Sequence, residues 1–170
     1  VVERGVIFVD LSLAQIAALG TTVAYLAGYD LHSSTAYLFS LGFTFLGAAI
    51  FAMSRVHRKT RIPQEAIIGI VYAVSAAAAV LVVDRAPQGG EHIKQILIGS
   101  ILTVTPAEVG KLALLYAPIG LLHWLIRRPL LDISFDPDGA GARRAVRAWD
   151  FVFYASFGVV VTSSVRLAGV

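Results

Sequence analysis

The sequence predicts an all-α protein, a polytopic bundle of transmembrane helices. Its 170 residues are 57% hydrophobic and only 15% charged, with a mean hydropathy of +0.76. A soluble domain carries about 25% charged residues, so this chain has too few polar side chains to cover a soluble globule of its size. Its basic residues bunch between apolar stretches instead of forming a basic face. We therefore expect an integral membrane protein, and neither a soluble enzyme nor a nucleic-acid-binding domain.

Five apolar runs are long enough to cross a bilayer, which takes about 20 residues. The expected spans are about 11–29, 35–54, 66–83, 109–126 and 151–170. A shorter apolar stretch, 93–105, contains Lys94 and Gln95 and is expected to form a re-entrant or interfacial helix. Residues 1–170 then make a single transmembrane domain. Because the chain starts at Val1 and stops inside an apolar run, we expect a fragment that is incomplete at both ends.

The distribution of Lys and Arg predicts the orientation of these spans. Basic residues cluster in the loops 55–65 and 127–150, whereas the loops between them hold few. Cytoplasmic loops carry an excess of Lys and Arg. The loops 55–65 and 127–150 are therefore expected in the cytoplasm, and all five spans then alternate in direction.

Three polar residues at or in the spans are candidates for a functional site. Asp10 stands at the entrance of the first span, Gln15 lies within it, and Glu65 opens the third span just after Pro63. Polar groups inside a membrane are costly and often functional. The alternative for both acids is a helix-end charge, because a carboxylate stabilises a helix N-terminus. His123, beside Trp124, is expected to be an interfacial anchor.

The loop 132–150 contains the signals of a short cytoplasmic helix at about 137–148. Asp136 suits a cap, Pro137 the first helical position, and Asp138 the positive end of the helix dipole. Arginines follow toward the other end, where cations are favoured. This helix is either an ordinary surface helix or a docking helix for a cytoplasmic partner.

Several kinds of site are absent from the sequence. It contains no cysteine, so disulfides, thiolate metal sites and a cysteine nucleophile are excluded. It also lacks the HExxH zinc motif, the G-x-S-x-G nucleophile motif and the phosphate-binding P-loop. We expect no enzymatic activity and no ATP hydrolysis from this chain alone.

Four segments, in order along the chain, carry a resemblance to a known family. They are RIPQEAIIGIVY at 61–72, IGSILTVTPAEV at 98–109, DISFDPD at 132–138 followed by arginines and Trp149-Asp150, and SVRLAGV at 164–170. The set resembles the permease subunit of metal-ion ABC transporters, the ABC-3 family of zinc, manganese and iron importers.

The resemblance implies a permease in a bacterial or archaeal inner membrane that works as a homodimer among membrane lipids. A separate ABC ATPase subunit would bind ATP, an extracytoplasmic metal-binding protein would deliver the ion, and this chain would bind no cofactor of its own. The divalent ion would be the substrate. The resemblance also implies that the loop 132–148 contacts the ATPase, through Asp136, Pro137, Asp138, Gly139, Arg143, Arg144 and Arg147.

One motif of the family is changed. Many members carry G-D-A-L-S-H-A, whose Asp and His are thought to meet the metal. Aligned here, that pair falls on Leu11 and Gln15, or, shifted by one residue, on Asp10 and Ala14. Gln15 offers an oxygen in place of an imidazole, which suits harder cations better than zinc. The metal-contact candidates are Asp10, Gln15 and Glu65. The change also keeps open a permease for a metal chelate or other small solute, and a membrane assembly factor that does not transport.

Overall fold

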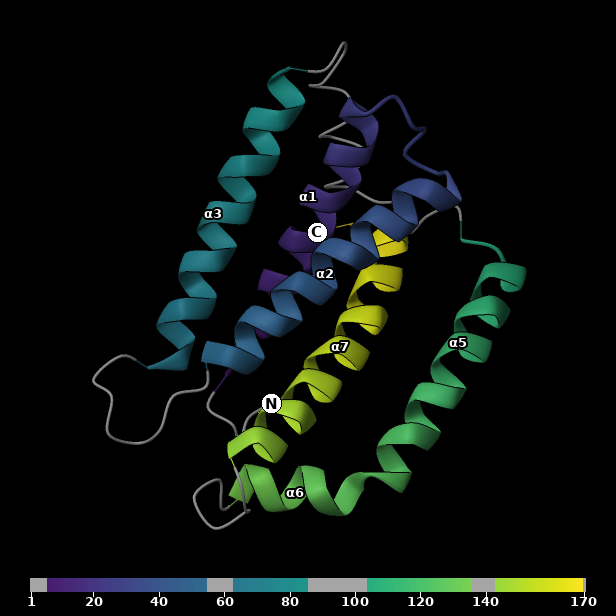
Figure 1. The fold of residues 1–170 in the computed structure, drawn as a ribbon. Helices are drawn as coiled ribbons and strands as arrows, with labels where there is room; N and C mark the ends of the chain where they lie inside the picture. The colour runs from purple at the N-terminus through teal and green to yellow at the C-terminus, as the bar shows by residue number, and fades with distance from the viewer. Residues whose placement is uncertain (1–5, 55–62, 86–103, 136–142, 170) are drawn as a thin grey trace.

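The computed structural model describes residues 6–54, 63–85, 104–135 and 143–169, and in these ranges the fold is all-α, as the sequence predicts. The helices run up and down beside one another (Figure 1). Their bounds are α1 Val9–Leu26, α2 Ser34–Ser54, α3 Gln64–Asp84, α5 Pro106–Leu125, α6 Arg127–Phe135 and α7 Arg143–Ala168.

Four of the described helices are long and apolar enough to cross a membrane: α1, α2, α3 and the part of α7 from Val146 to Val165. The pair α5 and α6 qualifies as a fifth crossing only if taken together, because the chain bends by 64° between them. The expected re-entrant or interfacial helix at 93–105 lies almost wholly outside the described residues.

The helix ends follow from local sequence. α1 ends at Leu26, and two residues later Gly28 has a positive φ of 91°, which allows the Gly28 N–H to reach the Tyr25 carbonyl and the Tyr29 N–H to reach the Ala24 carbonyl. α5 begins with a capping box, in which the Thr105 hydroxyl accepts from the Glu108 N–H while the Glu108 carboxylate accepts from the Thr105 N–H.

The segment 127–150 contains more helix than expected. Residues 127–135 form the helix α6, which buries Leu130 and Ile133, although its charged residues resemble a loop. The expected helix at 137–148 is described only in part: 136–142 lie outside the described residues, and the backbone from Arg143 onward is helical and belongs to α7. Nothing between Arg143 and the span breaks a helix, so the turns simply continue into it.

α1 lies at the centre of the bundle and packs against α2, α3 and α7. The core contains Leu13, Ile16, Phe51 and Tyr154. Glycines bring the backbones close together: a Cβ on Gly20 would lie 2.8 Å from the Ser40 Cα. Such small-residue contacts replace hydrophobic attraction as the packing device between helices in lipid. α5 is the exception, since none of its residues is buried.

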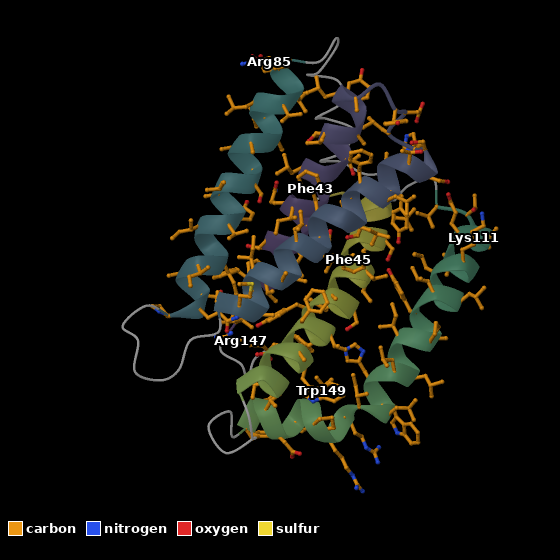
Figure 2. All side chains as sticks on the ribbon, in the orientation of Figure 1. Phe43, Phe45, Arg85, Lys111, Arg147 and Trp149 are labelled. Atoms are coloured by element: carbon orange, nitrogen blue, oxygen red, sulfur yellow. The ribbon has the colours of Figure 1, made fainter. Side chains whose placement is uncertain are left out.

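The ends of the described helices gather at two opposite ends of the bundle, as spans that alternate in direction predict. Figure 1 shows the end of α2, the start of α3, the helix α6 and the start of α7 at one end, and the end of α3 with the start of α5 at the other. We call these the inner end and the outer end. Arg147 lies at the inner end, and Arg85 and Lys111 lie at the outer end (Figure 2).

Candidate functional site

Glu65 binds the start of a neighbouring helix. Its carboxylate accepts hydrogen bonds from the backbone N–H of Ile7, at 3.1 Å, and of Phe8, at 2.9 Å. Phe8 is the N-cap residue of α1 and offers no side-chain cap of its own. Unpaired N–H groups at a helix start attract a carboxylate. Glu65 therefore caps α1 from α3, which is a different role from that of a charge on its own helix.

Asp10 and Gln15 lie on α1 close to this contact but point in different directions. Asp10 is exposed, and its Oδ1 accepts from the Leu11 N–H at 2.9 Å. Gln15 is half-buried. Five residues turn an α-helix by about 140°, so the two side chains leave different sides of α1. Among the described residues no group of three or more His, Asp or Glu is placed to hold a metal ion.

The inner end of α3 is tied to three helices at once. The Gln64 amide donates to the Phe51 carbonyl and to the Tyr154 hydroxyl, both at 3.1 Å. One turn further on, the buried Ser12 hydroxyl donates to the Ile68 carbonyl at 2.7 Å. Together with Glu65, these bonds connect the start of α3 to α1, α2 and α7. Gln64 was not among the residues predicted for a site, and its position next to Glu65 after a proline was the available signal.

The residues expected to contact an ATPase are only partly described. Asp136, Pro137, Asp138 and Gly139 lie outside the described residues. Arg143 and Arg144 belong to the first turn of α7, and Arg147 is exposed one turn later.

Polar side chains connect α5 to α7 at intervals of seven residues. The Tyr116 hydroxyl lies 3.0 Å from the Ser163 hydroxyl and 2.9 Å from that of Ser164. Two turns below, the His123 Nε2 lies 3.2 Å from the Ser156 hydroxyl. The His123 Nδ1 donates to the Ile119 carbonyl at 2.9 Å, since a carbonyl can only accept. His123 is thus a link between helices, and the heptad spacing on both helices is the signal that would have found this pairing.

A cavity of about 320 Å³ opens at the outer end of the same pair of helices. A carboxylate and an ammonium group of α5 line this cavity, together with hydroxyl groups and apolar side chains. The lining residues are His32, Tyr37, Glu108, Lys111, Leu112, Leu115, Ser163 and Leu167. Such a lining suits a small polar solute and not a bare cation, because an ammonium group stands beside the carboxylate.

Comparison with known proteins connects this fold to a transport family. The sequence model described as the ABC 3 transport family matches residues 1–170. The chain is 34% identical over 106 residues to the "Manganese transport system membrane protein MntB" of Synechocystis, covering 61% of this chain and 34% of that protein. It is 28% identical over 109 residues to the "Chelated iron transport system membrane protein YfeC" of Yersinia pestis, covering 60% and 37%.

An uncharacterized membrane protein of Synechocystis matches at 29% identity over 143 residues, or 84% of this chain and 48% of that protein. The chain thus spans about half, or less, of the curated relatives it matches. Among solved structures, PsaBC from Streptococcus pneumoniae in complex with Fab matches with a TM-score of 0.67 at 21% identity. That match covers 99% of this chain and 58% of the solved one, and at this identity it shows the fold.

Proposed function

This chain belongs to the ABC 3 transport family, and on that premise we propose that it is part of the permease of an ABC importer for divalent metal ions. The match over the whole of 1–170 carries this proposal, and the names of two relatives, a manganese and a chelated-iron system, support the substrate class. As a permease the chain makes and breaks no bonds. A separate ATPase subunit drives it, an extracytoplasmic binding protein delivers the ion, and a second copy completes the pathway.

The proposed coupling runs through the loop before α7. ATP binding and hydrolysis in the partner would push on residues 136–147, and the exposed Arg147 would bind a carboxylate of that partner. Because α7 continues from Arg143 into the span, a push there reaches the bundle without crossing a flexible joint.

Among the three candidates for ion contact, Asp10 fits best. Its carboxylate is exposed at the inner end of α1, whereas both oxygens of Glu65 lie within 3.3 Å of backbone N–H groups. A carboxylate oxygen such as that of Asp10 suits a hard cation such as manganese. Brief contact with few ligands also suits transport, because a tight site would retain the ion.

The proposal is tested with the full-length protein, co-expressed with its ATPase and binding protein. Cellular manganese, iron and zinc are measured by mass spectrometry. We expect one metal to rise, and the rise to disappear when 136–147 are replaced by a flexible linker. Asp10→Asn should lower uptake at least tenfold, while Asp84→Asn, at the outer end of α3, should not. An intact complex that moves none of the three metals would refute the proposal.

A second candidate function, import of a metal chelate, is favoured by the changed Asp/His motif. If the substrate is a bare ion, the double variant Leu11→Asp, Gln15→His restores the family pair and should shift uptake toward zinc. In a chelate importer, this double substitution should leave metal uptake unchanged. Such an importer should take up the metal only when a chelator is supplied with it.

A further inference from the structure

The corner between α5 and α6 presents apolar and aromatic side chains followed by cationic ones. Leu121 and Leu125 are 57% and 63% exposed, and Trp124 between them is 59% exposed. Arg127 and Arg128 follow at once, and both are exposed. This order matches the profile of a bilayer from its hydrocarbon core to its headgroups, in which tryptophan lies at the boundary.

α6 continues this surface along the membrane. The bend of 64° turns it away from the direction of α5. One side of α6 packs on α7 through the buried Leu130 and Ile133. The other side carries Arg127, Leu131 and Phe135, spaced four residues apart, of which the two apolar residues are 51% and 67% exposed. An exposed apolar row beside arginines is typical of a helix that lies in the membrane interface.

The arginine at the corner is held in a position suited to an anion. The Arg127 guanidinium carbon lies 5.1 Å from the centre of the Trp124 ring. A guanidinium that contacts an aromatic ring through its face keeps its N–H groups in the plane free, and these match the oxygens of a phosphate. Arg128 supplies a second positive charge beside it. On the described surface near this corner, Asp132 is the acidic residue that α6 contributes.

We propose that the α5–α6 corner binds the headgroup of an anionic phospholipid. Arg127 and Arg128 bind the phosphate, Trp124 lies at the level of the interface, and Leu131 and Phe135 contact the acyl chains. A lipid is favoured over a protein partner because the surface is continuous with the exposed apolar side of α5, which the apolar run 109–126 predicts to lie within the membrane. Each arginine near an anionic surface strengthens binding roughly fivefold, hence about 25-fold for the pair.

The test uses tryptophan fluorescence in lipid vesicles. Trp124 and Trp149 are the two tryptophans of this sequence, so Trp149→Phe, with any tryptophan elsewhere in the full-length protein also replaced, leaves Trp124 as the reporter. Brominated phosphatidylglycerol and brominated phosphatidylcholine are titrated as quenchers, and the ratio of their apparent affinities is measured. Taking a ratio removes the direct effect of Arg127 on Trp124 emission.

We expect phosphatidylglycerol to quench with at least tenfold preference at low salt. Arg127→Gln with Arg128→Gln should abolish the preference, and the lysine pair at these positions should retain most of it. Arg85→Gln with Lys111→Gln, which removes two charges at the outer end, should change nothing. Should the glutamine pair fail to fold, the parent in about 1 M salt must lose the preference, because the Debye length then shrinks to about 3 Å.

Two results would overturn the proposal. Equal quenching by both lipids would mean that the corner is a general interfacial anchor without selectivity for anions. Quenching by neither lipid, with Trp124 shielded from acrylamide once the purified ATPase is added, would assign the corner to the ATPase.

Discussion

Glu65 shows how one side chain can decide the position of a helix that begins far away in the sequence. α1 starts at the inner end of the bundle without a capping side chain of its own, and its first N–H groups would otherwise remain unpaired beside the membrane. Since the partner residues are separated by 57 and 58 positions, the contact also fixes how α1 and α3 approach each other. Glu65, whose charge would also suit a metal ligand, thus has a structural role: it holds the start of α1 against α3.

Glu65→Ala should therefore destabilise the protein by about 1 kcal/mol, the usual effect of losing a helix cap. The free energy of unfolding is measured by denaturant titration of the purified protein in detergent. Glu65→Gln, whose amide oxygen still accepts, should lose less. Asp84→Ala is the matched control, because it removes an acid from the other end of the same helix. If Glu65→Ala unfolds like the parent but no longer transports, the residue acts on the ion and not on α1.

At the scale of the elements, glycines and hydroxyl groups set the distances between helices. Gly20 lets α1 approach the backbone of α2, and Gly158 leaves room for the Thr44 side chain. Thr44 in turn lies 2.9 Å from Thr162 of α7, hydroxyl to hydroxyl. By contrast, α5 is held mainly by the ends of Tyr116 and His123, whose long side chains span a wider separation. The bundle thus contains a tightly packed group, α1, α2, α3 and α7, and a more loosely attached α5.

Gly20→Ala should cost about 1–3 kcal/mol of unfolding free energy, because the added methyl group meets backbone atoms of α2 within 2.9 Å. Gly42→Ala provides the control, since a Cβ there would have no neighbour within 4 Å. Helix propensity alone favours alanine over glycine by about 0.5–1 kcal/mol, so Gly42→Ala should be neutral or stabilising. Equal effects of the two substitutions on thermal unfolding would contradict the close approach.

Some helices of this fold could be predicted from the sequence, and others could not. Uncharged runs near 20 residues long predict membrane helices because the bilayer demands them, and α1, α2 and α3 were found in this way. α6 was not predicted, because its sequence is dominated by charged residues, Arg127, Arg128 and Asp132. Its buried pair, Leu130 and Ile133, can be recognised only when the position of α7 is known. The partner of Glu65 was missed for a related reason: a backbone N–H carries no signal in the sequence.

At the scale of the whole molecule, charge and shape agree on one orientation. Among the described residues, Arg127, Arg128 and Arg147 lie at the inner end, and the cavity with charges of both signs lies at the outer end. The positive-inside rule then predicts that the arginines of the inner end face the cytoplasm and that the cavity opens on the opposite side of the membrane.

This orientation can be tested with thiol reagents, because the sequence has no cysteine. His32→Cys and Asp132→Cys each introduce one exposed thiol, in the loop before α2 and on α6, after any cysteines elsewhere in the full-length protein are replaced by serine. A membrane-impermeant maleimide should label the thiol at position 32 in intact cells, and the thiol at position 132 only after the membrane is permeabilised. The reverse labelling pattern would show that the protein has the opposite orientation in the membrane.

The continuity of α7 has a mechanical consequence. At 26 residues, it is about 39 Å long, from a rise of about 1.5 Å per residue, and it joins the arginines at the inner end to the hydroxyl groups that contact Tyr116. A continuous helix of this kind moves as one rigid unit, so a tilt at its inner end also displaces its outer end. Turning it by about 5° around its inner end would sweep its far end through about 3 Å, roughly the length of a hydrogen bond. Leverage of this size would suffice to break the contacts of Ser163 and Ser164 with α5.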